Sequence, residues 1–216
     1  IVGVYVGLKT INLPLGAIVG LFAVIGVGIG FGLQNVASNF VSGVILLIER
    51  PVKVGDRVGV GDLWGDVVKI SLRTTLIRTP DNVMIIVPNS KLLEDNVTNY
   101  SFQDKRIRLR IPVGVAYGSD VEQVKECLLE TARGHAEVLG TPEPAVWFRE
   151  FGDSSLNFEL LAWIADPARK YWVTSALNEG IDAAFDDAGI EIPFPQRDLH
   201  IRDSSHALRV VRDEAN

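Results

Sequence analysis

The feature that most constrains this chain is an uncharged, apolar stretch near its N-terminus. No charged residue occurs from residue 10 to residue 48, and every second residue from 26 to 32 is glycine. Glycine costs a helix in water about 1 kcal/mol relative to alanine. In a bilayer the backbone has no competing hydrogen-bond partner, so the helix persists, and small residues let neighbouring helices approach closely. The stretch is therefore typical of a membrane helix that packs through glycine.

A helical arrangement places these glycines on two opposite flanks. At about 100° per residue, glycines four positions apart share one side, and the two pairs lie on nearly opposite sides. The residues concerned are Gly26, Gly28, Gly30 and Gly32. Such a helix can lie between two copies of itself, and repetition of that contact closes a ring. A single packed membrane helix with a small-residue face is the alternative interpretation.

Two apolar side chains lie between the glycine rows. Val27 and Phe31 are each about a quarter turn from both rows. In a ring of such helices, both side chains from every copy would point towards one axis. Two stacked apolar rings around a narrow lumen form a constriction that can gate by dewetting. We therefore expect Val27 and Phe31 to form the pore constriction.

The apolar run is longer than one membrane crossing. Residues 15–33 approach the roughly 20 residues that span a bilayer, and Gln34 and Asn35 then interrupt the run. Residues 36–48 carry polar side chains on one face and apolar side chains on the other, which is typical of a helix lying along the interface. We therefore predict a pore-lining and interfacial helix over residues 15–50 with a kink near Asn35. One long tilted helix is the alternative.

Positive charges follow the apolar stretch directly. Pro51 cannot continue the helix cheaply, and Arg50, Lys53 and Arg57 lie within a few residues of it. Positive charge that flanks a membrane span marks the cytoplasmic side. We therefore expect these three residues to be membrane-interface charges and everything after residue 48 to be cytoplasmic.

The rest of the chain has the composition of a soluble protein and divides into two segments. Short strand patterns and tight turns predict a small all-β domain over residues 51–102. The order strand, helix, strand, strand, helix over residues 103–192 predicts an α/β domain of ferredoxin-like type, with its first helix ending near residue 139. Residues 193–201 form an extended segment that we expect to pair between subunits, and residues 202–216 are expected to be a flexible tail.

Composition argues against several functional classes. The net charge of −6 disfavours a general nucleic-acid surface. One cysteine, Cys127, and three dispersed histidines do not make a zinc site. The glycine spacing does not fit a dinucleotide fingerprint, and no catalytic set of carboxylates or of Ser, His and Asp has a convincing context. We therefore predict that the chain is not an enzyme and has no cofactor or metal.

Several motifs together resemble the mechanosensitive channel of small conductance family, most closely its large, potassium-linked branch. The resemblance covers nearly the whole chain and is specific, whereas the glycine run alone is not. The motifs are GFGLQNVASNFVSG at 30–43, ERPVKVGDRV at 49–58, RTTLIRTPDNVMIIVPNS at 73–90, GVAYGSD at 114–120 and PFPQ at 193–196. Because residues 1–14 correspond to the end of a preceding membrane helix and a turn, we expect a longer membrane protein.

The resemblance implies a homoheptamer whose pore helix packs through alternating small residues and is sealed by Val27 and Phe31. The family bends this helix at a glycine that aligns with Asn35, and a second family glycine matches Gly43, so both are candidate hinges. The Sm-like β domain and the α/β domain would form a hollow cytoplasmic cage closed by a C-terminal inter-subunit β-barrel strand, here from residues 193–201.

The implied function is release of ions and small osmolytes when membrane tension rises during hypo-osmotic shock. The implied location is a bacterial inner membrane, and the implied partners are membrane lipid, permeating solutes and further copies of the chain, with no nucleic acid. Two alternatives remain open at this point. One is a ligand- or ion-gated channel of the same architecture, and the other is a non-conducting membrane scaffold.

Overall fold

The computed structural model describes residues 15–198 of the chain. The preceding membrane helix and turn expected at residues 1–14 and the tail expected at 202–216 lie outside the described residues, as does the end of the segment 193–201. The chain divides into two compact units after Arg106. Each unit is described by itself below.

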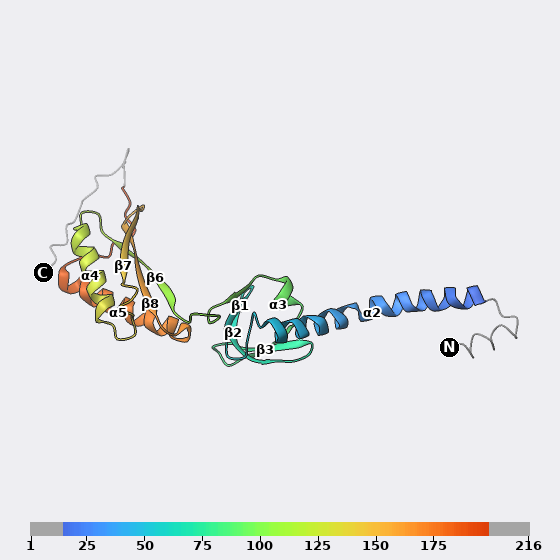
Figure 1. Cartoon of the computed structure of the whole chain (residues 1–216). Helices are drawn as coiled ribbons and strands as arrows, with labels where there is room; N and C mark the ends of the chain where they lie inside the picture. The colour runs from blue at the N-terminus through green and yellow to red at the C-terminus, as the bar shows by residue number, and fades with distance from the viewer. Residues whose placement is uncertain (1–14, 199–216) are drawn as a thin grey trace, which may run out of the picture. The chain divides into compact units, whose positions relative to one another are not determined.

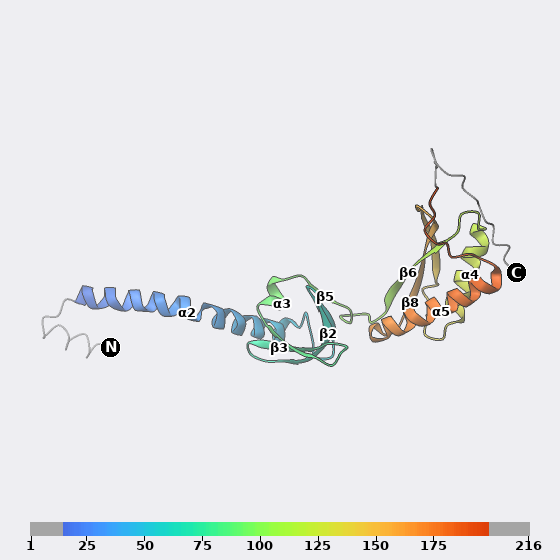
Figure 2. The same ribbon diagram turned by 180° about the vertical axis from the view of Figure 1, so that it is seen from behind.

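The first unit begins with α2, a helix of 35 residues over Leu15–Glu49 (Figures 1 and 2). Among the described residues, Val19–Glu49 is the one stretch of helix long and apolar enough to cross a membrane, with a mean hydropathy of 1.8. The helix is continuous over its whole length, so the pore-lining segment and the interfacial segment distinguished by sequence belong to one helix. A change of direction near Asn35 stays a prediction.

Five strands and a short helix complete the first unit. The antiparallel sheet has the order β4-β3-β2-β1-β5. Its strands are β1 (Arg57–Val60), β2 (Leu63–Ile70), β3 (Thr74–Arg78), β4 (Met84–Pro88) and β5 (Val97–Asn99), and α3 spans Lys91–Glu94. The predicted strands of this segment are present, whereas β5 and α3 were not expected. Both are too short to give a periodic pattern.

The core of the first unit joins the helix to the sheet. Leu46, near the end of α2, is fully buried in one apolar cluster with strand residues such as Val58 and Ile77. Burial of a leucine side chain contributes about 2 kcal/mol. The last turns of α2 are therefore part of the β unit, while the earlier turns extend away from it (Figure 1).

The second unit has the predicted order of elements. Its elements are β6 (Ile107–Val115), α4 (Val121–Gly134), β7 (Ala145–Phe151), β8 (Leu156–Ile164), the 3-10 turn η1 (Pro167–Arg169) and α5 (Lys170–Ala188). The antiparallel sheet has the order β6-β8-β7. One face packs against α4 and α5 through a cluster that includes Leu128, Phe158 and Phe185.

The ends of the two helices follow local signals, with one correction. Asp120 caps α4 by accepting hydrogen bonds from the amides of Glu122 and Gln123 at 2.9 and 3.2 Å, and Gly189 ends α5 in a left-handed conformation, as its position predicts. The expected extension of α4 to residue 139 is wrong. The helix ends at Gly134, and the Leu139 amide instead donates to the Trp163 carbonyl beside β8 at 2.7 Å.

The segment after α5 has no regular secondary structure up to residue 198. Beyond the hydrogen bonds that end α5, two more hold it to the rest of the second unit. The Ala116 amide donates to the Glu191 carbonyl at 2.8 Å, and the Gln196 amide donates to the Ser154 hydroxyl at 3.0 Å. Pairing of residues 193–201 with other subunits stays a prediction.

Candidate functional site

The first half of α2 carries two glycine rows that no other part of the described chain covers. A Cβ atom built at any of these glycines would have no neighbouring atom within 4 Å. The residues are Gly26, Gly28, Gly30 and Gly32. Lipid-facing positions have no need of glycine, whereas a helix that packs on both flanks does. Both rows are thus open to contact with neighbouring helices.

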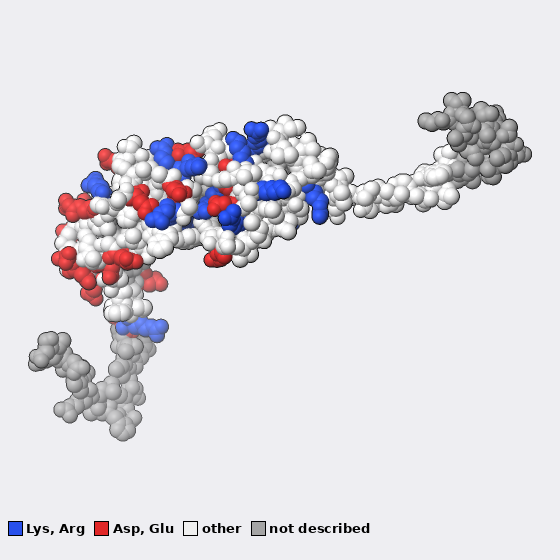
Figure 3. Space-filling model, turned by 90° about the horizontal axis from the view of Figure 1, so that it is seen from below, with Lys and Arg blue, Asp and Glu red and all other residues white. Residues whose placement is uncertain are grey.

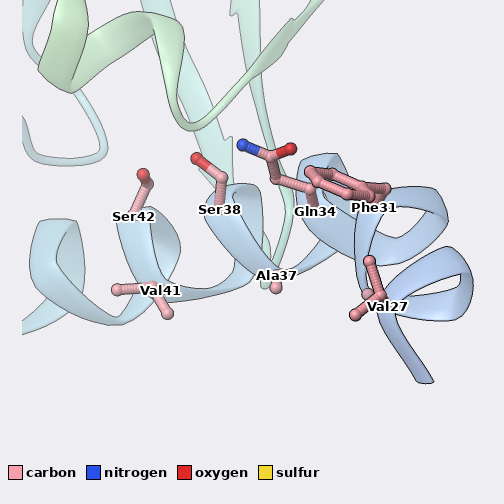
Figure 4. Close-up of a pocket in the computed structure, with 8 residues that line it drawn as sticks. Val27, Phe31, Gln34, Ala37, Ser38, Val41 and Ser42 are labelled. Carbon is pink, nitrogen blue, oxygen red and sulfur yellow. The ribbon is translucent and has the colours of Figure 1, made fainter. Parts of the chain in front are cut away.

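Val27 and Phe31 lie between these rows and are exposed, with 59% and 75% of their surfaces accessible. Both line a groove of about 680 Å³ along α2, together with Gln34 and Ser38. Figure 4 shows the Phe31 ring next to the Gln34 side chain, and the Ser38 and Ser42 hydroxyls follow along the same side of the helix. Val27 and Phe31 therefore form an apolar end of the groove, and the polar side chains of Gln34, Ser38 and Ser42 follow it along the helix.

The second half of α2 is fixed to the β unit by an asparagine and a glycine. Asn39 Oδ1 accepts a hydrogen bond from the Ser90 amide at 3.1 Å, and Asn39 Nδ2 donates to the Asn35 carbonyl at 2.7 Å. A Cβ at Gly43 would overlap the Leu72 carbonyl oxygen. The helix backbone therefore approaches the loop between β2 and β3 as closely as only glycine permits.

A buried asparagine supports this contact from the β unit. Asn89 is fully buried. Its Oδ1 accepts from the Thr75 hydroxyl at 2.8 Å, and its Nδ2 donates to the Ser71 carbonyl at 2.9 Å. Because both ends of the amide are bonded, the turn that precedes α3 holds the Ser90 amide in place for Asn39.

The three interface charges predicted from sequence have different surroundings. Arg57 is paired within its own sheet: its Nε and terminal nitrogen donate to the two carboxylate oxygens of Asp66, each at 2.6 Å, and its guanidinium lies 4.6 Å from the Trp64 ring centre. Arg50 and Lys53 take part in no ion pair with the described residues. Their charges remain available at the end of α2.

The residues predicted from sequence are Val27, Phe31, the four glycines, Asn35, Gly43 and the three cations. The structure places Arg50 and Lys53 in the turn after α2, Arg57 at the start of β1 and all the others on α2. Sequence reasoning missed Asn39 and Asn89. Asn39 sits on the polar face of the second helical segment, and Asn89 follows Pro88 at the end of a strand. The Asn39 bond spans 51 residues, and the buried Asn89 amide is bonded to residues 14 and 18 positions away. Contacts over such separations have no local signature, so only the polar residue types could have suggested them.

The second unit offers no comparable site among its described residues. No group of three or more His, Cys, Asp or Glu side chains in residues 15–198 could hold a metal ion. The Cys127 thiol donates to the Ala184 carbonyl at 3.4 Å, and burial raises its pKa, helped by the nearby Glu130 and Asp187 carboxylates. A protonated thiol is a poor nucleophile, so this cysteine is not suited to covalent catalysis.

Comparison with known proteins matches both units. The family described as "Mechanosensitive ion channel, beta-domain" matches residues 35–102, and the one described as "Mechanosensitive ion channel MscS, C-terminal" matches residues 109–192. The mechanosensitive channel MscK of Escherichia coli is 39% identical over 195 residues, which cover 89% of this chain. An MscS family protein of Buchnera aphidicola is 32% identical and covers 90% of this chain, and the match spans 69% of that relative.

A solved structure agrees with these matches. The closed-state crystal structure of Helicobacter pylori MscS superposes with a TM-score of 0.85 at 28% identity, covering 92% of this chain and 78% of that one. The chain spans only a small part of the longer relatives that it matches, 17% of MscK for example.

Proposed function

Because the chain belongs to the MscS family of mechanosensitive ion channels, we propose that it supplies the ion pathway of a tension-gated channel that releases ions and small osmolytes on hypo-osmotic shock. The family consists of channels, so the prediction that the chain is not an enzyme is confirmed. Its membership also makes the chain part of a membrane protein, with α2 as the candidate membrane helix.

The observation that carries the proposal is the pair of uncovered glycine rows beside exposed Val27 and Phe31. Helices of a homo-oligomer, a heptamer by family resemblance, pack through the two rows. Each contact is head-to-tail, so it closes a ring. Val27 and Phe31 from all copies then form two apolar rings that keep the lumen dry.

Tension opens the channel because it favours the state with the larger area in the membrane plane. The glycine flanks let neighbouring helices slide and tilt, which moves Val27 and Phe31 away from the axis until water enters. Asn35 and Gly43 remain the candidate points at which α2 bends. Gly43 now has a second reason for being glycine, its close approach to Leu72.

The assembled channel resides in a bacterial inner membrane, with the β domain of residues 51–102 and the α/β domain of residues 103–192 in the cytoplasm. Residues 193–201 supply one strand per subunit to a closing barrel. Arg50 and Lys53 follow the apolar helix and form no ion pair with any residue from 15 to 198. Their positive charge at this end of the helix supports the orientation because cytoplasmic flanks are rich in Lys and Arg.

The test is patch-clamp recording of the full-length parent protein in a membrane that lacks other tension-gated channels. We expect discrete openings that track suction, and a lower threshold for Phe31→Ser and Val27→Ser, because a polar ring hydrates more readily. Ile29→Ser is the matched control, since Ile29 is similarly exposed but lies on the other side of the helix, two residues or about 200° away. Silence up to lytic tension, or a higher threshold in the Phe31 variant, would overturn the proposal.

A further inference from the structure

A cavity of about 270 Å³ lies at the end of α2, where the helix meets the sheet of the first unit. Its walls combine apolar side chains with two cations. It is lined by Leu46, Leu47, Arg50, Val52, Lys53, Val54 and Ile70. Residues 46–54 follow one another in sequence, so the cavity forms where the chain turns from the apolar helix into the β unit.

The two cations of the cavity carry charge that the described chain does not neutralise. Arg50 uses only its Nε in a hydrogen bond, a contact of 3.4 Å to the Leu47 carbonyl. The Lys53 ammonium lies 5.9 Å from the Phe102 ring centre. Neither forms an ion pair with any residue from 15 to 198. Glu49, next to Arg50, is exposed and forms no ion pair within residues 15–198. Asp56, three residues after Lys53, accepts a hydrogen bond from the Lys53 backbone amide at 2.9 Å and another from Asn99 Nδ2 at 2.8 Å, but forms no ion pair with the Lys53 ammonium.

The backbone fixes Arg50 at the mouth of this cavity. Arg50 has a φ of 54°, a left-handed conformation that is uncommon for a side chain other than glycine or asparagine. Its amide donates to the Leu46 carbonyl at 3.1 Å, and Pro51 follows. The chain therefore reverses at Arg50 and brings Lys53 and Val54 back beside Leu47.

The position of the cavity relates it to a bilayer surface. It lies where α2, the helix among residues 15–198 that is long and apolar enough to cross a membrane, ends at Glu49. Leu47 and Val54 keep 48% and 61% of their surfaces exposed. On the face that Figure 3 shows, the charged side chains nearest the base of the helix are Lys or Arg, and the part of the helix that extends away from the sheet has no charged side chain. Apolar walls and two cations that form no ion pair within residues 15–198 thus lie together at the end of the candidate membrane helix.

We propose that this cavity binds the headgroup of an anionic phospholipid, with the phosphate between Arg50 and Lys53 and the start of an acyl chain against Leu47 and Val54. Basic pockets on the cytoplasmic side of membrane helices bind anionic headgroups in this way. The lipid would tie the bilayer surface to the turn where α2 enters the β unit. Lipid binding at this place is independent of whether tension opens the pore.

The test measures equilibrium lipid binding to the full-length protein in detergent by native mass spectrometry. The probes are phosphatidylglycerol, phosphatidylcholine with the same acyl chains, and soluble glycerol phosphate. We expect tighter binding of phosphatidylglycerol than of phosphatidylcholine, and a loss of about thirtyfold in phosphatidylglycerol affinity for the double variant Arg50→Gln with Lys53→Gln, since each cation near an anionic lipid contributes about fivefold.

The control is Arg78→Gln with Lys105→Gln, which removes the same charge from two exposed residues of the first unit that do not line the cavity. This control should retain the lipid preference. A second variant, Val54→Asn, should weaken binding of both lipids.

Equal affinity for the two lipids, an unchanged affinity in the Arg50 and Lys53 variant, or binding of glycerol phosphate as tight as that of phosphatidylglycerol would overturn the proposal. None of these outcomes depends on channel opening, so tension gating is tested separately.

Discussion

The side chain of Asn39 on α2 binds the backbone of Ser90, 51 residues away, through a hydrogen bond of 3.1 Å. It is a direct polar link between the helix that carries the candidate pore residues and the turn before α3. Leu46 adds an apolar anchor two turns further along the helix. If α2 moves relative to its sheet, either this hydrogen bond breaks or the turn at Ser90 moves with the helix.

We predict that Asn39→Ala loosens the turn at Ser90. Loss of one hydrogen bond of this kind costs about 1 kcal/mol. The turn at Ser90 should therefore open locally about five times more often. Hydrogen–deuterium exchange of the full-length protein should therefore show faster exchange in peptides that contain the Ser90 amide. Ser38→Ala is the control, because Ser38 neighbours Asn39 but makes no hydrogen bond to Ser90. Unchanged exchange in the Asn39 variant would mean that the link does not hold the turn.

Gly43 and Gly28 should respond differently to the same substitution. In Gly43→Ala the new methyl group meets the Leu72 carbonyl and, at 2.6 Å, the Asn89 amide nitrogen. Overpacking of this kind costs about 1–3 kcal/mol, so the melting temperature of the protein should fall. Gly28→Ala meets no atom of residues 15–198 within 4 Å, so it should leave the stability of the described units intact while shifting the tension threshold.

Thermal unfolding and patch-clamp recording of both glycine variants separate the two roles. A stable Gly43→Ala protein would show that the helix can move away from Leu72 at little cost, as a hinge would allow. A Gly28→Ala channel with an unchanged threshold would count against a subunit contact at the glycine rows.

The sequence predicted those parts of the fold that depend on local patterns. The uncharged run predicted α2, and Asp120 and Gly189 marked the start of one helix and the end of another, because caps and apolar periodicity are local properties. Contacts between distant segments were not predictable. Gly43 was named as a candidate hinge from the family resemblance, which stays a prediction, and its packing against Leu72 became visible only in the structure.

The same limit applies to two further features. Arg57 followed the apolar stretch and was grouped with the interface charges, which stays a prediction, and no local pattern indicated that the pairing of β1 with β2 places it opposite Asp66. The expected extension of α4 ran through residues 135–139 because their sequence has no strong breaker. In the structure that segment bonds to the end of β8, where Val138 forms a bridge with Ile164.

We predict that Arg57→Lys destabilises the first unit although the charge is kept. The guanidinium makes two hydrogen bonds to the two carboxylate oxygens of Asp66 and lies 4.6 Å from the Trp64 ring centre. A lysine ammonium cannot reproduce this planar, two-pronged geometry. Because Asp66 is partly exposed, the cost should be only about 1 kcal/mol. Urea unfolding of the purified protein measures it. Arg78→Lys, an exposed arginine of the same sheet, should unfold as the unaltered protein does, and equal stability of the Arg57 variant would contradict the prediction.

The thiol of Cys127 should react slowly near neutral pH. Burial raises its pKa, and the Glu130 and Asp187 carboxylates raise it further because they disfavour a nearby thiolate. The folded state thus holds the proton more tightly than the unfolded chain, so this group's contribution to stability is present below the ordinary thiol pKa and is lost as pH rises through the folded value. Iodoacetamide labelling should have its pH midpoint above that of free cysteine, and Glu130→Gln with Asp187→Asn should lower it. Glu122→Gln, an exposed change elsewhere on α4, should leave the midpoint in place. A midpoint equal to that of the free thiol would show that neither burial nor the two carboxylates raise the pKa of the Cys127 thiol.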